Sequence, residues 1–434
     1  MRSHCNMKLK SVILSSLLFT SSTLSAAIIK PIKGVIEQVD PVINQLEPRI
    51  TSQVESIRKH ELIDDATAIV TSLPKRLEIL NQLQAPAFVE VDVEHGFRAV
   101  ERQWIMLANE QHQEKLLQIG AQIIVTKQYT SLGLSLVRFV VPTNYDSKAH
   151  LQRLLSLDDA ALLDRNHIYQ AQNGSQQDAS SSKLTAMCDW PVKIGMIDSA
   201  IDTTHPGFSN TQIKMQSFLA NDLVSPDLHG TAVAGVLVGK YGQLMPLLTE
   251  ATLYSAAVFY QQSDLSQGAT LAAIVEALNW LVANEVPVIN MSFTGPDNAI
   301  LAAAINATAA KQVTLVAAAG NEGPAALPLY PAAYQHVIAV TALDSQNRIY
   351  RWSNRGDYID FAALGVNVMT LKAGGDLGRE SGTSIAAPRI SAAAACLAAK
   401  PNTTPKNIYH ALQQQANDLG EVGKDAVFGH GVID

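Results

Sequence analysis

The six residues Lys193–Asp198 read KIGMID and set the pattern for the second half of the chain. A short apolar run that ends in a carboxylate is typical of a buried strand followed by a loop. Similar apolar runs lie at 253–259, 286–291 and 313–319, and they alternate with segments that read as helices, at 231–239, 269–283 and 298–311. Because buried parallel strands read as short hydrophobic runs that alternate with helices, we expect one large α/β domain over residues 189–434.

Upstream of this domain, residues 86–170 show a different pattern. Residues 88–93 alternate like a strand, and Gln103–Ile119 reads as a helix that Gly120 stops. The remaining predicted elements are strands at 123–129, 134–141 and 162–169, and a helix at 147–157. The order βαββαβ predicts a small ferredoxin-like α+β unit, a fold that by itself carries no function.

The N-terminus has the layout of a secretory signal peptide. Lys8 and Lys10 precede the apolar run Val12–Phe19, and small residues follow it up to Ala27. Basic, then apolar, then small residues are the features of a cleavable signal. We therefore assign residues 1–27 to a signal peptide and expect a secreted protein, extracellular or periplasmic.

Two segments connect these parts. Residues 28–85 read as a helical preamble that Pro31, Pro41 and Pro48 break into short pieces, and we assign it no function. Residues 171–188 are assigned to a linker, because 171–183 are polar and low in apolar residues, and a linker is where proteases cut.

The charge balance excludes one class of partner. The chain has 32 basic and 39 acidic side chains, a net charge of −7. Residues 1–188 carry 19 of each sign, so the remaining 13 basic and 20 acidic side chains leave the whole excess in residues 189–434. Nucleic-acid binding needs a basic patch, so we expect no nucleic-acid partner. After the signal, no apolar run has the ~20 residues of a membrane span.

The cysteines leave one question open. Of three in the chain, Cys5 would leave with the signal, and Cys188 and Cys396 would remain. Two cysteines are too few for a disulfide framework, and the sequence does not decide whether these two are bridged.

Four segments join a reactive side chain to small residues at a strand end or helix start. They are IGMIDSAIDTTHP (194–206), HGTAVAG (229–235), AAAGNEG (317–323) and GTSIAAP (382–388). A serine nucleophile needs a positioned base, histidine titrates near neutrality, and a buried aspartate orients the imidazole. Free N–H groups at a helix start can hold an oxyanion, and the amide of Asn321 can add a second donor.

These segments resemble the active-site motifs of the subtilisin-like serine peptidases, the subtilases, in the chain order Asp, His, Ser. The spacings, 31 residues from Asp198 to His229 and 155 from His229 to Ser384, also resemble those of the family. Asn321 falls where the oxyanion asparagine of the family belongs. The resemblance spans Val192–Asp434.

The resemblance implies a function and a set of residues. The fold would be a subtilisin-like parallel-sheet catalytic domain at 189–434, preceded by the ferredoxin-like unit at 86–170 as an inhibitory pro-domain that assists folding. The protein would be a secreted serine endopeptidase that acts through an acyl-enzyme and processes itself between about Tyr169 and Met187. Its partners would be polypeptide substrates and its own pro-domain in cis, and we expect a monomer. The implied catalytic residues are Asp198, His229 and Ser384, with the Asn321 side chain and the Ser384 N–H as the oxyanion hole.

The segment Ser292, Phe293, Thr294 and Gly295 resembles the substrate-binding strand of the family, preceded by the core residues Val288 and Ile289. Thr294 stands where a second glycine often lines the first pocket, so the side-chain preference stays open.

Other departures bear on metals and cofactors. Gly207 stands where a calcium-ligating aspartate is common, and the loop between Gly239 and Ala251 is short. Calcium prefers several oxygen ligands, so we assign no metal and no cofactor. His205 is interpreted as a loop-packing residue.

Three alternatives remain. The scaffold could be a catalytically silent binding protein, the same triad could transfer peptide bonds instead of hydrolysing them, and the small unit could be a permanently attached interaction domain.

Overall fold

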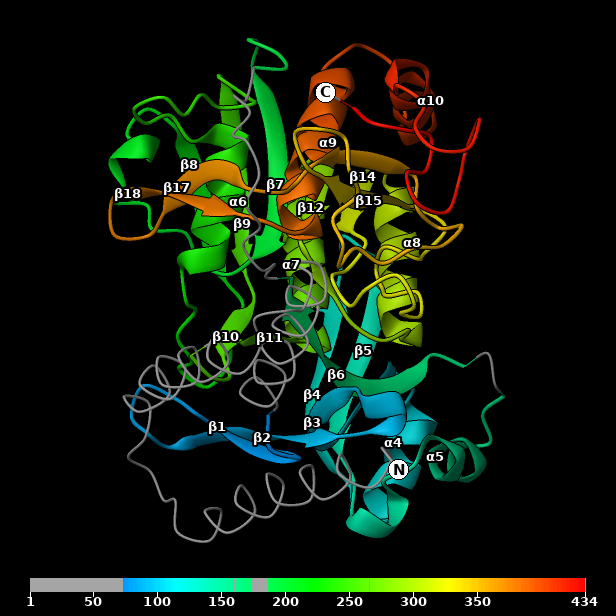
Figure 1. Ribbon diagram of the computed structural model, residues 1–434. Helices are drawn as coiled ribbons and strands as arrows, with labels where there is room; N and C mark the ends of the chain where they lie inside the picture. The colour runs from blue at the N-terminus through cyan, green and yellow to red at the C-terminus, as the bar shows by residue number, and fades with distance from the viewer. Residues whose placement is uncertain (1–72, 159–160, 173–185, 265, 434) are drawn as a thin grey trace, which may run out of the picture. The chain divides into compact units, whose positions relative to one another are not determined.

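The computed structural model describes residues 73–158, 161–172, 186–264 and 266–433 (Figure 1). Its largest element is a seven-stranded sheet with the order β16-β15-β14-β12-β7-β9-β8, in which all neighbouring strands are parallel. The strands are β7 Val192–Asp198, β8 Gln212–Ser217, β9 Ala251–Ala257, β12 Val288–Met291, β14 Thr314–Ala318, β15 Val337–Leu343 and β16 Phe361–Leu364. The predicted α/β class is confirmed.

Helices cover both faces of this sheet. On β12, Val288 packs in the cluster that includes residues of α6 (Leu228–Val238) and α9 (Thr383–Ala398). The next residue, Ile289, packs in the cluster that includes α7 (Leu271–Ala283) and α8 (Ala299–Ala310). Neighbouring strand residues point to opposite faces, so the strands are buried on both sides, and both residues are fully buried, as expected.

A ferredoxin-like unit precedes this domain. It consists of β3 Arg98–Leu107, α4 Glu110–Gln118, β4 Gln122–Tyr129, β5 Leu134–Val140, α5 Lys148–Leu155 and β6 Leu163–Ala171. The strands are antiparallel in the order β4-β5-β3-β6. The predicted fold of the unit is therefore correct, although its first strand is not the predicted one.

The helix predicted from Gln103 is wrong in its first part, because Gln103–Leu107 belongs to β3 and α4 begins at Glu110. Trp104 and Met106 pack in the cluster of α4 and α5, whereas Ile105 packs in the cluster of α7 and α8. The strand is thus buried on both faces, and a continuous apolar run lacks the alternation that marks a half-buried strand.

A hairpin of β1 (Arg76–Leu80) and β2 (Pro86–Asp92) adds to the edge of β3. The prediction of a helical preamble at 28–85 is therefore wrong from Arg76 onward. Residues 1–72, which hold the predicted signal peptide and most of that preamble, lie outside the described residues.

The strand β6 reaches beyond its own unit. It pairs antiparallel with β11 (Gln267–Thr270) and with β13 (Phe293–Thr294), while β11 pairs with β10 (Phe259–Gln261). Ala171, which was predicted to start the linker, is the last residue of β6. Of that linker, residues 173–185 lie outside the described residues.

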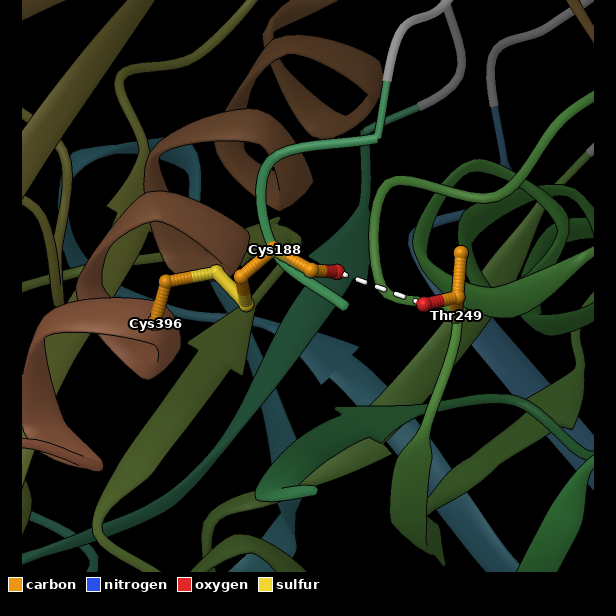
Figure 2. Close-up of a disulfide and its surroundings, with 3 residues drawn as sticks. All are labelled: Cys188, Thr249 and Cys396. Carbon is orange, nitrogen blue, oxygen red and sulfur yellow. Dashed lines mark hydrogen bonds between the residues drawn. A yellow bond between two sulfur atoms is a disulfide. The ribbon is translucent and has the colours of Figure 1, made fainter. Parts of the chain in front are cut away.

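A disulfide joins Cys188 to Cys396 on α9, 208 residues further along the chain (Figure 2). The Thr249 hydroxyl donates a hydrogen bond of 3.4 Å to the Cys188 carbonyl. Cys188 and Cys396 are therefore bridged, which the sequence alone did not decide.

The remaining elements are the hairpin β17 Val368–Lys372 and β18 Asp376–Glu380, and the helix α10 Pro405–Gln415. Within the described ranges, none of the helices has the length and hydrophobicity needed to cross a membrane.

Candidate active site

Asp198 and His229 form a buried pair at the carboxyl edge of the parallel sheet. Asp198 ends β7 and His229 lies in the first turn of α6. The Nδ1 atom of His229 lies 2.7 Å from Oδ1 of Asp198, which also accepts a 2.7 Å hydrogen bond from the Ser199 N–H. Burial alone would lower the pKa of His229, but the charge and hydrogen bond of Asp198 raise it above its ordinary value of 6.5.

The residue after His229 has to be small. A Cβ at Gly230 would collide with the backbone carbonyl oxygens of Ser199 and Ala200. The Gly230 N–H donates 2.8 Å to the Ser199 hydroxyl. This close approach holds the start of α6 against the end of β7, which brings the histidine and the aspartate together.

Ser384 lies in the first turn of α9, after Gly382, whose φ of +136° disfavours any side chain. Pro388 lies one turn further along the same helix. Since Pro388 has no N–H, it cannot donate to the carbonyl four residues earlier, which is that of Ser384. The Ser292 hydroxyl donates to this carbonyl instead, at 2.9 Å.

The side chain of Ser292 therefore holds α9, and only its backbone lies on the predicted substrate-binding strand. Its Oγ accepts 2.9 Å from the amide of Asn290, whose oxygen accepts 2.9 Å from the Ser391 hydroxyl. All these side chains are buried. The chain of hydrogen bonds fixes the position of α9 relative to β12.

Asn321 is oriented by Thr383. The amide oxygen of Asn321 accepts 3.0 Å hydrogen bonds from both the N–H and the hydroxyl of Thr383. The amide nitrogen is thereby turned to the other side, where it lies 3.3 Å from the carbonyl oxygen of Gln172.

Two of the predicted site residues meet at the carbonyl group of Gln172. The Ser384 hydroxyl donates to its oxygen at 2.6 Å, in addition to the Asn321 amide. Among the described residues, the Nε2 atom of His229 has no hydrogen-bond partner. Ser384 and Asn321, predicted as the nucleophile and the oxyanion-hole residue, thus both contact one peptide carbonyl of the chain itself.

Two strands hold the segment that leads to this carbonyl. On one side Gly268 and Ala269 of β11 pair with Gln170 and Tyr169, and on the other Phe293 and Thr294 of β13 pair with Ala171 and Gln170. The Gln172 N–H continues this pairing to the Ser292 carbonyl at 3.4 Å.

The strand β11 was not expected from the sequence. Its residues Ala269 and Thr270 were predicted to begin a helix that in fact begins at Leu271. The run Gln-Gly-Ala-Thr carries no strand pattern of its own, so no local signal marks it as one wall of the cleft.

Tyr169 fills a pocket in that cleft. Its side chain is fully buried, its hydroxyl donates 3.1 Å to the Pro296 carbonyl, and its ring meets that of Phe293 edge to face, with the ring centroids 6.0 Å apart. Gly295 packs flat against the tyrosine ring, where a Cβ would collide with it. Of the predicted substrate-binding residues, Phe293 and Gly295 therefore face an aromatic side chain.

The side chain of Gln172 has its own contacts. Its amide nitrogen donates 2.6 Å to the Thr294 hydroxyl, and its amide oxygen accepts 2.9 Å from the Asn321 N–H. Gln172 was predicted to belong to a linker, yet only 7% of its surface is exposed.

His205 lies outside this group and packs a loop, as interpreted from the sequence. Its Nδ1 accepts 2.9 Å from the Gly207 N–H, and its Nε2 lies 2.9 Å from the Asp376 carbonyl. Among the residues that the structure describes, no three His, Cys, Asp or Glu side chains come together as metal ligands would.

Comparisons with known proteins agree with this geometry. The sequence model described as the subtilase family, Peptidase S8, matches residues 191–431. The chain is 32% identical over 247 residues to the minor extracellular protease Epr of Bacillus subtilis (strain 168), covering 56% of this chain and 37% of Epr. It is 30% identical over 250 residues to subtilisin E of the same organism, covering 56% of this chain and 64% of that one.

These alignments span less than two thirds of either relative. Among solved structures, the prenylagaramide maturation protease PagA matches with 26% identity and a TM-score of 0.49, covering 56% of this chain and 90% of that chain.

Proposed function

Because this chain belongs to the subtilase family, whose sequence model covers more than half of it, we propose that it is a serine endopeptidase made as a self-processing precursor. Ser384 is the nucleophile, His229 the general base and Asp198 the residue that orients His229. The Asn321 amide and the Ser384 N–H bind the oxyanion.

The proposed reaction proceeds through an acyl-enzyme. His229 takes the proton of the Ser384 hydroxyl as its oxygen attacks the peptide carbonyl carbon, and returns that proton to the leaving amine. Asp198 stabilises the imidazolium formed in between. Water, activated by His229, then releases the acyl group from Ser384. The donors around the carbonyl oxygen stabilise its negative charge in both steps.

One observation carries the proposal: the Gln172 carbonyl oxygen lies 2.6 Å from the Ser384 hydroxyl and 3.3 Å from the Asn321 amide. A buried peptide carbonyl held by a serine hydroxyl and an amide donor is how a bound substrate would lie. It supports cleavage of the bond between Gln172 and Asn173, within the interval expected from the sequence.

On this proposal the described residues up to Gln172 form the pro-part, which includes the ferredoxin-like unit and the hairpin β1-β2. Two side chains of β6 support a role in folding. Asn166 accepts 3.0 Å from the Ala272 N–H at the start of α7, and Asp164 accepts 3.1 Å from the Ala299 N–H at the start of α8. Acceptors at helix N-termini satisfy donors that the helix leaves unpaired.

We further propose that residues 1–27 are a signal peptide and that the protein acts as a secreted monomer on polypeptides. The disulfide supports this location, because such bonds persist in oxidising compartments outside the cytosol.

The test uses the full chain, expressed for secretion, and its Ser384→Ala variant. We expect intact mass analysis to find a cut after Gln172 in the native protein and none in the variant, and a fluorophosphonate to label only the native protein. Ser209→Ala, at an exposed serine outside the cleft, is the control and should process normally. A Ser384→Ala chain that is still cut after Gln172 when purified away from other proteases would refute self-processing. An unlabelled, uncut native chain would instead favour the silent binding protein.

A further inference from the structure

The pocket that receives Gln172 is lined by a polar side chain that the sequence left unexplained. Thr294 is 2% exposed, and its hydroxyl receives the amide nitrogen of Gln172 at 2.6 Å. The sequence comparison with the family favoured a glycine at this position, which would leave that amide without a partner.

The backbone fixes which way the glutamine amide points. The Asn321 N–H can only donate, so the atom facing it at 2.9 Å is the amide oxygen. The amide nitrogen must then face Thr294, whose hydroxyl acts as the acceptor. Both ends of the amide are thus paired with groups that belong to the catalytic domain.

We propose that Thr294 is a specificity-determining residue and that the enzyme selects glutamine as the residue whose carbonyl is attacked. This inference rests on the proposed function and names its substrate class: polypeptides cut on the carboxyl side of glutamine. A side chain of equal length without the amide would leave the Thr294 hydroxyl and the Asn321 N–H unpaired in a buried pocket, which is costly.

Two side chains of nearly the same size as glutamine separate the contribution of its hydrogen bonds from that of its neutral charge. Methionine keeps the length and loses both hydrogen bonds. Glutamate keeps acceptors for the Asn321 N–H and the Thr294 hydroxyl, but it places a charge in a pocket where the side chain is almost fully buried, which disfavours it. Glutamine alone among the three satisfies the pocket while staying neutral.

The test measures kcat/KM with enzyme processed from the full chain. The substrates are quenched peptides that contain Tyr-Gln-Ala-Gln-Asn-Gly, the sequence from Tyr169 to Gly174, and the same peptides with methionine or glutamate at the fourth position. For the native enzyme we expect the glutamine peptide to be cut at least roughly tenfold faster than either, as expected when a buried hydrogen bond is lost.

Thr294→Val keeps the shape of the side chain and removes its hydroxyl. We expect this variant to reduce the preference for glutamine over methionine by about tenfold, while Thr294→Ser, which keeps the hydroxyl, retains most of it. The matched control is Thr341→Val, at a buried threonine of β15 whose hydroxyl has no hydrogen-bond partner within the described residues. It should keep the full preference. The four combinations of two enzymes and two peptides form a double-mutant cycle that isolates the Thr294 contact.

Casein hydrolysis and fluorophosphonate labelling of each variant keep the two proposals apart. An enzyme that is labelled and cuts casein, but cuts the methionine peptide as fast as the glutamine peptide, overturns the inference and leaves the proposed function standing. A preference for glutamine that Thr294→Val leaves unchanged also overturns the role of Thr294. A native chain that is neither labelled nor active on any substrate overturns the proposed function itself. If Thr294→Val does not fold, Thr294→Ser decides the matter. A Thr294→Ser enzyme that still prefers glutamine supports the inference, and one that has lost this preference overturns the inference.

Discussion

The Ser384 hydroxyl lies 2.6 Å from the carbonyl oxygen of Gln172, a residue 212 positions earlier in the chain. The contact depends on β6, which carries the end of the ferredoxin-like unit between β11 and β13. Strand addition gives affinity through main-chain hydrogen bonds, and pockets for the side chains add selectivity. The end of β6 thus lies between these two strands in the way that we expect a substrate to lie.

Removal of the Asn321 side chain should slow the chemical step. Besides the Ser384 hydroxyl, which is the proposed nucleophile, its amide is the side-chain donor that contacts the Gln172 carbonyl oxygen among the described residues. For Asn321→Ala we expect kcat on peptides to fall by about 10²–10³, the range known for loss of one oxyanion donor in subtilisin, with little change in KM. Asn306→Ala, on the exposed side of α8, is the control. A rise in KM as large as the expected fall in kcat would instead indicate that substrate binding is lost.

The raised pKa of His229 should appear in a titration. Because Asp198 raises this pKa above 6.5, the neutral base forms only as the pH rises through the raised value, so activity should fall on the acid side of it. NMR titration of His229 in the uncut Ser384→Ala chain should give a midpoint above 6.5, and adding Asp198→Asn should lower it. A His229 midpoint that Asp198→Asn leaves unchanged would contradict the assignment of Asp198 as the residue that raises this pKa.

The raised pKa of His229 also makes the stability of the folded protein depend on pH. The folded state binds the His229 proton more tightly than the unfolded chain does. The resulting stabilisation is therefore fully present below pH 6.5 and is lost as the pH rises through the folded-state pKa.

Gly295→Ala should weaken the binding of an aromatic side chain three residues before the attacked one. A Cβ at Gly295 collides with the ring of Tyr169, so either the ring or the strand must shift. We expect the kcat/KM of the processed enzyme to fall about tenfold for a peptide with tyrosine at that position and less for one with alanine. Gly378→Ala, where an added Cβ has ordinary contacts, serves as the control. Equal losses on both peptides would mean general damage to the cleft.

A buried carboxylate holds the hairpin β1-β2 to the catalytic domain. Glu90 is fully buried and accepts hydrogen bonds of 2.7 Å from Arg98, 2.7 Å from the Tyr260 hydroxyl, and 2.9 and 2.7 Å from the amide of Gln262. Loss of one partner from such a group costs roughly 3–5 kcal/mol. Glu90→Ala should therefore let the cut pro-part dissociate faster.

Gel filtration of the freshly processed protein and recovery of activity with time would measure this release. Glu78→Ala, on the exposed surface of the same hairpin, should behave as the native protein does. Unchanged release by Glu90→Ala would show that the pro-part is held elsewhere.

The disulfide should contribute much of the stability of the catalytic domain. A bond across 208 residues restricts the unfolded chain, and the chain-entropy relation gives about 5 kcal/mol for a loop of this size. Urea unfolding of the Ser384→Ala chain, in which self-digestion does not interfere, should show this loss after Cys188→Ser and Cys396→Ser are introduced together. A change under about 1 kcal/mol would show that the reduced, unfolded chain keeps residual structure.

The parts of the site that carry reactive groups could be predicted from the sequence, because each stands in a local motif. Gly230 and Gly382 are required by the close backbone contacts and the φ angle beside His229 and Ser384. Such requirements leave a readable pattern around each reactive residue, and the parallel sheet leaves one in its apolar runs.

The residues that hold the peptide could not be predicted in the same way. Gln172 reads as linker because it is polar, yet partners more than 100 positions away bury it. The short strand β11 takes its conformation from pairing with β6, about 100 positions earlier. Local patterns do not report contacts over such separations. The end of β3, Gln103–Leu107, was mistaken for a helix because burial on both faces removes the alternation that marks a strand.

The position of the disulfide determines what a cut after Gln172 would leave behind. Both of its cysteines lie on the carboxyl side of that bond, and since they are bonded to each other, neither is free to hold Cys5. No cross-link would then tie the two products together, and their separation would be a matter of affinity and dilution alone. Reducing agents should therefore not speed the departure of the pro-part, whereas diluting the processed protein should.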